Sequence, residues 1–428
     1  MLFDQTLTYI SLFSGAGVGC YGLLEEGFEC VATNEILEKR LNIQRINRKC
    51  KFDESYISGD IKKPEAKEKI LKQIEFYSKK FGNDRVDLVV ATPPCQGMSV
   101  ANHKKKNDEI KRNSLVVESI DLIKQIKPRF FILENVPSFY KTGCIDKNDN
   151  LLEIGSMIEQ NLSGDYMLYD EVINFKNFGA NSSRTRTLVI GVCKEFKDFI
   201  SALEFFPDFK QEKTLKEVIG SLKPLAWGEY DSTDFYHSFR TYPKHMQEWI
   251  KDLKEGQSAF ENVQDAISDL AYLCSNEGAF ESDYLNPIQS SYQALMRKDS
   301  PKLYNHQATN HSQAALEKLK LINKEQGKEC LPKNLHGKQQ FKSTWGRLNW
   351  NKISPTIDTR FDTPSNGTNS HSELHRSITP REAARIQSFS DNYIFYGNKT
   401  SVCKQIGNAV PPLLALALGK AILKNLRK

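Results

Sequence analysis

Short runs of β-branched and aromatic residues alternate with segments of helical period from the N-terminus to about residue 192, and this alternation limits the fold more than any other feature. The apolar runs are residues 8–13, 29–34, 87–92, 130–135 and 187–192. Between two of them, residues 115–126 place Leu115, Ile120 and Ile123 mainly on one stripe, as an amphipathic helix does. Strands and helices in this order predict an α/β fold built on a mostly parallel sheet.

The pattern changes at about residue 195. From there to about residue 350 the chain is rich in lysine, aromatic residues, asparagine and serine, without regular alternation. Regular structure is expected again at Thr379-Pro380-Arg381-Glu382, a capping box with proline at the first helical position, which predicts a helix to about residue 389. A last apolar segment begins at Pro411-Pro412 and suits a helix that packs back on the sheet.

At 428 residues the chain is too long for one ordinary core, so two or three packing units are expected. We predict a first domain over residues 1–195, a small domain over 196–397 with its variable part at about 200–350, and a C-terminal segment over 398–428 that returns to the first domain. The net charge of +6 favours a polyanionic partner without identifying one.

The start of the chain carries Asp4 and lacks a basic leader, and no apolar run reaches the ~20 residues that span a bilayer. Nine cysteines are scattered without a Cys-x-x-Cys pair, which argues against a disulfide framework or a thiolate metal site. We therefore expect a cytoplasmic protein with no membrane segment and no metal.

A glycine-rich turn, residues 13–19, follows the first strand and precedes a helix, where a backbone can approach a ligand closely. An ordinary turn would explain the glycines alone, because the spacing is not Gly-x-Gly-x-x-Gly. Glu35 ends the next strand about 20 residues on, where a carboxylate can accept hydrogen bonds from both ribose hydroxyls. Asp60 and Ile61 follow another β-like run and suit an adenine amino group and ring. The pattern favours an adenosine ligand.

Cys95 lies just beyond the strand at 87–92, in a loop that Pro93 and Pro94 stiffen. A single cysteine is ordinarily a small core residue, but a thiol in a rigid loop at a strand's carboxyl end is typical of reactive thiols. Glu134 ends the next strand after four apolar residues. Burial there would raise the pKa of its carboxyl and let it donate a proton, although it could instead cap the following turn.

In content and order these motifs resemble those of the DNA cytosine-5 methyltransferase family, of the prokaryotic modification-methylase type. The matching elements are Phe13 to Gly17, Glu35, Asp60, Pro94-Cys95-Gln96, Glu134-Asn135-Val136, Arg184 with Arg186, Arg381 to Arg385 and Gly407-Asn408. They span nearly the whole catalytic part, and together they are very specific. Ser182 and Ile36 depart from the family pattern, where many members carry a glutamine and some an aromatic residue.

The resemblance implies an S-adenosyl-L-methionine-dependent, Rossmann-like catalytic domain over 1–195 and a target-recognition domain over 196–397. It implies that the Cys95 thiolate adds to C6 of cytosine and that Glu134 acts at N3. Arg184 and Arg186 would hold O2 and the nearby backbone. The cofactor residues that it implies are Phe13, Gly15, Gly17, Glu35, Ile36, Asp60, Ile61, Pro94, Leu115 and Asn408.

The implied partner is double-stranded DNA with the target base flipped out, because a duplex hides both faces of the cytosine. Residues 102–113 would meet phosphates through Lys104, Lys105, Lys106 and Arg112 or form an ordinary solvated loop. The family also implies a cognate restriction endonuclease as genetic partner, and we expect a monomer. Sequence choice is predicted to reside in residues 200–350, with Arg240, Asn310, Gln313, Gln339, Gln340 and Arg347 as candidate base readers.

Three alternatives remain at this point. A transfer-RNA cytosine-5 methyltransferase would share the catalytic residues, but the long segment at 195–350 and the lack of a Cys-Phe-Thr tripeptide argue against it. A nicotinamide-dependent oxidoreductase would rest on the glycine turn and Glu35 alone, leaving Cys95 and Glu134 unexplained. A catalytically silent DNA-binding module is disfavoured by the same two residues.

Overall fold

The computed structural model describes residues 6–94, 113–197, 205–206, 212–226, 229, 303–323, 327–336 and 343–426. The chain divides into two compact units, residues 1–212 with 409–428 and residues 213–408. The C-terminal residues therefore belong to the same unit as the N-terminal ones. Cys95 and most of the loop at 102–113 lie outside the described residues.

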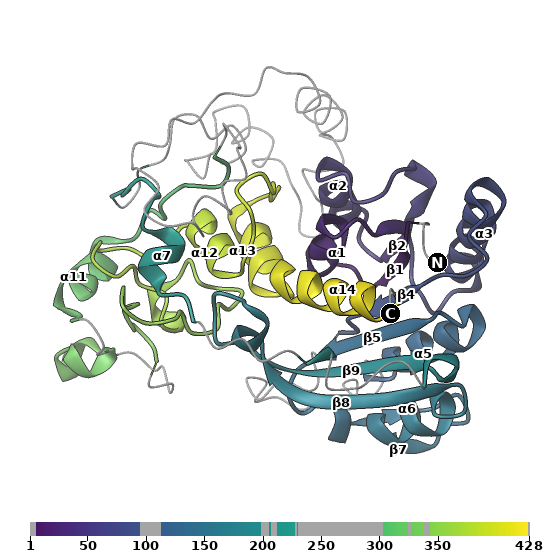
Figure 1. The fold of residues 1–428 in the computed structure, drawn as a ribbon. Helices are drawn as coiled ribbons and strands as arrows, with labels where there is room; N and C mark the ends of the chain where they lie inside the picture. The colour runs from purple at the N-terminus through teal and green to yellow at the C-terminus, as the bar shows by residue number, and fades with distance from the viewer. Residues whose placement is uncertain are drawn as a thin grey trace, which may run out of the picture. The chain divides into compact units, whose positions relative to one another are not determined.

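Within the described residues, a seven-stranded sheet with the order β3-β2-β1-β4-β5-β9-β8 forms the centre of the first unit (Figure 1). Its strands are β1 Thr8–Leu12, β2 Glu29–Glu35, β3 Tyr56–Ser58, β4 Leu88–Ala91, β5 Phe130–Asn135, β8 Tyr166–Asn174 and β9 Thr185–Cys193. Strands β1 to β5 are parallel, and β9 pairs antiparallel with both β5 and β8. The predicted α/β fold with a mostly parallel sheet is confirmed.

Helices cover both faces of this sheet because successive strand side chains point to opposite sides. On one face, Phe131 and Leu133 of β5 share a core with α3 (Pro64–Phe81), α5 (Leu115–Ile126) and α6 (Ile154–Leu162). On the other face, Ile132 shares a core with α1 (Tyr21–Glu25) and α14 (Pro412–Leu426). Helix α2 (Glu38–Ile46) follows β2, and a small hairpin joins β6 (Gly143–Ile145) to β7 (Leu151–Glu153).

Helix α14 begins at the second proline of Pro411-Pro412, as the sequence indicates, and packs on α1. Gly22 makes this close packing feasible, because a Cβ there would lie 2.0 Å from the Pro412 carbonyl oxygen. The stretch Lys399–Leu426 is long and apolar enough to cross a membrane by length and composition alone. Its apolar window is 67% buried within the protein, as expected of a helix that packs on a core.

The described part of the second unit includes α7 (Leu215–Ile219), α11 (Gln313–Leu321), α12 (Pro380–Ile386) and α13 (Lys399–Gly407). The capping box predicted before α12 is present, with Thr379 and Glu382 each accepting from the other's backbone N–H. The helix ends at Ile386, three residues before the predicted end, and Ser388 then adopts a φ of 70°. That left-handed conformation is incompatible with a continuing helix.

Candidate active site

The residues singled out from the sequence follow the carboxyl ends of neighbouring parallel strands. The glycine turn follows β1, Glu35 ends β2, Asp60 follows β3, and Glu134 lies near the end of β5. The chain connects β1 to β2 on one side, whereas β4 and β5 lie on the other side of β1. This reversal in strand order is the position where open α/β sheets bind ligands.

The glycine turn has an unusual backbone conformation. Phe13, Gly15 and Gly17 have φ values of 53°, 55° and 84°. A Cβ at Gly15 would meet nothing within 4 Å, so there is open space beside this residue. A Cβ at Gly17 would lie 2.6 Å from Cγ of Gln44, so the turn fits closely against that side chain. The turn thus combines a tightly packed side with an open one.

Glu35 is buried and already hydrogen-bonded to the backbone. Its Oε2 accepts from the Gly15 N–H at 2.9 Å, and its Oε1 accepts from the Leu37 N–H at 3.2 Å. Arg40 adds an ion pair of 3.1 Å to Oε1. These contacts fix the carboxylate beside the glycine turn, and one acceptor site remains on Oε2 because each carboxylate oxygen has two.

The other predicted cofactor residues differ in exposure. Asp60 is half-buried and accepts from the Lys62 N–H at 3.0 Å, whereas Ile61 is buried in the core. Ile36 is 60% exposed, which is unusual for a large apolar side chain beside a buried carboxylate. An exposed apolar group at this position is available to cover a ligand ring.

Three further cofactor predictions fall on the described residues. Pro94 is half-buried and is the last residue described before Cys95. Leu115 is the first residue of α5 and packs partly buried against the core of the first unit. Asn408 is the exposed C-cap residue of α13 in the second unit, and the next residue belongs to the first unit.

Glu134 lies on the sheet face that α14 covers, since Ile132 two residues earlier faces the same core. Burial raises the pKa of Glu134 above its ordinary value, and the cations Arg186 and Arg184 partly offset that rise. The Arg186 Nε atom is 3.4 Å from the Glu134 Oε1 atom. Arg184 is buried and directly precedes β9, which starts two residues before the apolar run at 187–192.

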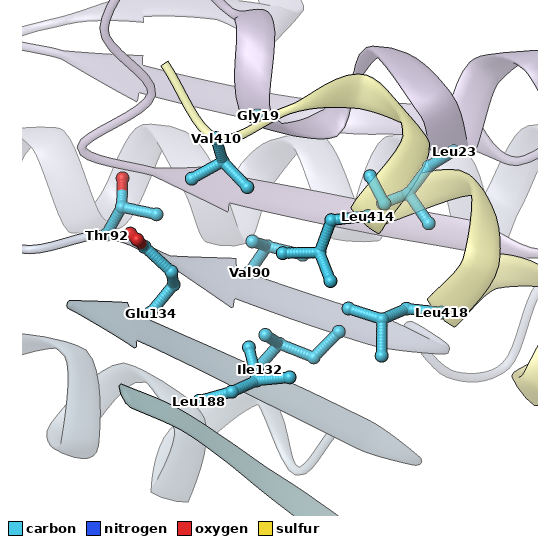
Figure 2. Close-up of a pocket in the computed structure, with 11 residues that line it drawn as sticks. Gly19, Leu23, Val90, Thr92, Ile132, Glu134, Leu188, Val410, Leu414 and Leu418 are labelled. Atoms are coloured by element: carbon cyan, nitrogen blue, oxygen red, sulfur yellow. The ribbon is translucent and has the colours of Figure 1, made fainter. Parts of the chain in front are cut away.

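An apolar cavity lies beneath the Glu134 carboxyl group. Figure 2 shows the carboxyl end of Glu134 next to the Thr92 side chain at one end of the cavity, with the Thr92 hydroxyl directed away from it. The cavity is lined by Gly19, Leu23, Val90, Thr92, Ile132, Glu134, Leu188, Val410, Leu414, Ala415 and Leu418. Sheet residues form one side of it, and residues of α14 form the other. These walls explain why burial dominates the pKa of Glu134.

Two residues that the sequence did not single out hold the backbone that leads to Cys95. The Asn135 side chain donates to the Pro93 carbonyl oxygen at 2.9 Å, and Asn135 is buried. The Thr92 hydroxyl donates to the Phe13 carbonyl oxygen at 3.2 Å. Asn135 belongs to the Glu-Asn-Val motif, which could have indicated it. Nothing in the sequence distinguishes Thr92.

The candidate base readers differ in burial and in whether the structure describes them. Arg347 is buried, and its guanidinium donates to the carbonyl oxygens of Leu319, Ile322, His371 and Leu374. A guanidinium held this way is a structural one, so Arg347 is removed from the candidates. Asn310 and Gln313 are exposed, whereas Arg240, Gln339 and Gln340 lie outside the described residues.

Comparison with known proteins extends this picture. Residues 7–424 match the model of the C-5 cytosine-specific DNA methylase family. Type II methyltransferase M.DdeI of Desulfomicrobium norvegicum is 29% identical over 357 residues, which cover 79% of this chain and 72% of that protein. Type II methyltransferase M1.HphI of Haemophilus parahaemolyticus is 25% identical over 425 residues, which cover 99% of this chain and 88% of that protein.

The fold is also similar to that of a solved structure described as a DNA modification methyltransferase encoded within an E. coli prophage. The two share 24% sequence identity with a TM-score of 0.62, over 99% of this chain and 100% of that one. This likeness supports the fold, and the family match over residues 7–424 confirms the resemblance seen in the motifs. The chain therefore belongs to the C-5 cytosine-specific DNA methylase family.

Proposed function

We propose that this enzyme transfers a methyl group from S-adenosyl-L-methionine to C5 of a flipped-out cytosine in a specific duplex DNA sequence, through a covalent bond between Cys95 and C6. One observation carries the proposal beyond family membership. Glu134 is a buried carboxyl with a raised pKa, and Arg186 lies 3.4 Å away. It lies on β5, next to the strand that leads into the Cys95 loop. A proton donor on the strand next to the one that precedes Cys95 in the sequence, paired with a cation, suits nucleophilic attack on a base.

The residues at the strand ends fit S-adenosyl-L-methionine. Gly15 leaves open space on one side of the turn. Glu35 and Asp60 place carboxylates after neighbouring strands, which suits ribose hydroxyls and an adenine amino group. The exposed Ile36 can cover the ring. Bound there, the cofactor would supply an electrophilic methyl group on a sulfonium.

Cytosine C5 is a poor nucleophile, so the chain must first activate the ring. The Cys95 thiolate forms a bond to C6 while Glu134 gives a proton to N3, and the C5=C6 electron pair becomes available at C5. C5 would then accept the methyl group as its bond to the sulfonium sulfur breaks, leaving a thioether. A base then takes the C5 proton, the bond between C6 and the Cys95 sulfur breaks to release the thiolate, and the aromatic ring is restored. N3 returns its proton to Glu134, so the enzyme regains its starting state.

Arg184 and Arg186 would neutralise charge at the base. The Arg186 Nη1 atom donates to the Thr185 carbonyl oxygen at 2.7 Å, which fixes its guanidinium beside Glu134. Remaining N–H groups of this guanidinium can donate to the O2 atom of the base. The cation also limits the rise in the pKa of Glu134, so the carboxyl can lose its proton as well as hold it.

Duplex DNA is the partner that this chemistry requires, with base flipping to expose C6. We assign catalysis to a domain at 1–195, target choice to a domain at 196–397, and a return to the catalytic domain to residues 398–428. Relatives named type II methyltransferases support a restriction endonuclease as genetic partner. A transfer-RNA substrate is the second candidate, because the catalytic residues would be shared.

Duplexes carrying 5-fluorocytosine in the target site test the covalent step, because fluorine cannot leave C5 as a proton does. Bisulfite sequencing of DNA from cells that express the chain first identifies the modified site. We then expect a fluorinated duplex to form a stable adduct with the protein when S-adenosyl-L-methionine is present. A Cys95→Ala protein that still trapped DNA would refute the assignment of the nucleophile. Methylation of transfer RNA instead of DNA would favour the second candidate.

A further inference from the structure

Gln44 of α2 is a polar side chain that is completely buried behind the glycine turn. Its Nε2 donates to the Ser14 Oγ at 2.8 Å and to the Gly15 carbonyl oxygen at 2.7 Å. Its Oε1 accepts from the Thr33 hydroxyl at 2.7 Å. The amide therefore connects β2 to the turn through three hydrogen bonds, which is more than packing of an amphipathic helix requires.

The orientation of this amide is determined by its neighbours. Lys49 is buried, and its ammonium donates to the Thr33 oxygen at 3.1 Å. Because an ammonium can only donate, Thr33 accepts from it and turns its own O–H toward Gln44. The Gly15 carbonyl can only accept, so it requires Nε2 on its side. Lys49, Thr33 and Gln44 thus form a directed chain of hydrogen bonds that ends on the turn.

The turn needs such support. Phe13 adopts a φ of 53°, a left-handed conformation that is unfavourable for a residue with a side chain. Backbone of this kind persists where the surroundings hold it in place. Glu35 holds the Gly15 N–H from one side, and Gln44 holds the Gly15 carbonyl from the other. The Gln44 Cγ atom also lies 2.6 Å from the position that a Cβ at Gly17 would take, so Gln44 forms the packed side of the turn.

We propose that Gln44, oriented by Lys49 through Thr33, is a positioning residue that keeps Phe13 to Gly17 in the conformation that binds the cofactor. This inference rests on the proposed function, in which the turn binds S-adenosyl-L-methionine. Gln44 does not touch the reacting atoms. Its loss should weaken cofactor binding without changing the chemistry that follows at saturation.

Equilibrium binding of S-adenosylhomocysteine, measured by calorimetry on the full chain, tests this role. Gln44→Met keeps the volume and removes the amide, and we expect its Kd to rise by about 10-fold or more because two loop acceptors lose a buried donor. Turnover at saturating cofactor should stay within about 2-fold. Hydrogen exchange of the amides of Ser14 to Gly17 should become faster. Gln73→Met, which removes a buried amide from α3, is the matched control and should leave the Kd unchanged.

Thr33 provides a second pair of variants in case Gln44→Met does not fold. Thr33→Val removes the hydroxyl that orients the amide and should raise the Kd. Thr33→Ser retains the hydroxyl and should bind with the parental Kd. A folded Gln44→Met protein with the parental Kd, or equal Kd values for the two Thr33 variants, would overturn the inference. If the parental protein bound no S-adenosylhomocysteine, the proposed function itself would fail instead.

Discussion

Glu134 has an environment in which burial and neighbouring charge act in opposite directions. Burial favours the neutral carboxyl and raises its pKa, whereas Arg186 and Arg184 favour the carboxylate. The raised pKa favours a protonated carboxyl, and the two cations limit that rise so that the group can still give up its proton, as a general acid must. The apolar cavity beneath it is therefore part of its chemistry.

At the residue scale, we expect Glu134→Gln to lose about 100-fold or more in turnover, the usual scale for a positioned general acid. Cofactor binding should be unchanged. In the parental enzyme the protonated form is active, so turnover should fall as the pH rises through the raised pKa of Glu134. Single-turnover methylation across a pH series measures both effects. A Glu134→Gln protein with the parental rate would show that the proton comes from elsewhere.

The same substitution has a predicted effect on stability. A carboxyl whose pKa is raised by folding holds its proton more tightly in the folded state, so its contribution to stability falls as the pH rises above the unfolded value. Glutamine cannot ionise, so the variant does not lose stability in this way as the pH rises. Glu134→Gln should therefore unfold at the same or a higher urea concentration than the parent at pH 8, which also serves as the folding control. Glu159→Gln, at an exposed position on α6, should show no such gain.

At the scale of elements, α14 builds one side of the cavity beneath Glu134. Leu414 is buried there, whereas Leu413 beside it is half-buried and does not line the cavity. We expect Leu414→Ala to reduce the free energy of unfolding by about 2–5 kcal/mol, because removing a buried leucine enlarges an existing void. Leu413→Ala should reduce the free energy of unfolding by a smaller amount. Urea denaturation of both variants makes the comparison, and equal losses would contradict this role of α14.

The helix α12 depends on a buried ion pair. Burial alone would raise the pKa of Glu382, but Arg376 lowers it to about 2. Two contacts of 2.8 and 2.7 Å join the guanidinium to the carboxylate. This pairing stabilises the second unit at any pH above the pKa that a glutamate has in the unfolded chain. That stability is lost as the pH falls through the lower pKa that Glu382 has in the folded protein.

Arg376→Met should therefore destabilise the second unit by about 3–5 kcal/mol at neutral pH, because it leaves Glu382 charged, buried and without its cation. Adding Glu382→Gln removes the stranded charge and should recover part of the loss. Chemical denaturation of the two variants and the parent, at neutral pH, measures the coupling. A double variant less stable than Arg376→Met would argue against the ion pair as the cause.

At the scale of the whole molecule, sequence choice is predicted to reside in residues 200–350. Of the candidate base readers, Asn310 and Gln313 are exposed, and Arg347 is engaged with four backbone carbonyls. Replacing residues 200–350 with the corresponding region of a family member that methylates another site should transfer that site, while Cys95 and Glu134 continue to act. Bisulfite sequencing reads the outcome. An active chimera that kept the original site would place recognition elsewhere, most simply in the loop after Cys95.

Local pattern was enough to predict the α/β class, the parallel strands that lead to the site, the helix over residues 115–126 and the capping box at Thr379. Each of these depends on residues close together in the sequence. The edge strand β8 was not predicted, because its mixed burial and its acidic Asp170 and Glu171 hide the alternation of a strand.

The tertiary structure alone decided the environment of each functional side chain. Glu134 has a raised pKa because α14, which starts 278 residues later in the chain (412 − 134), covers its face of the sheet. Gln44 supports the glycine turn although nothing in the sequence distinguishes it, and Arg347, a candidate base reader from the sequence, is buried among carbonyls. A local pattern specifies backbone preference and the side that is apolar, whereas burial and hydrogen-bond partners arise from contacts between residues that are distant in the chain.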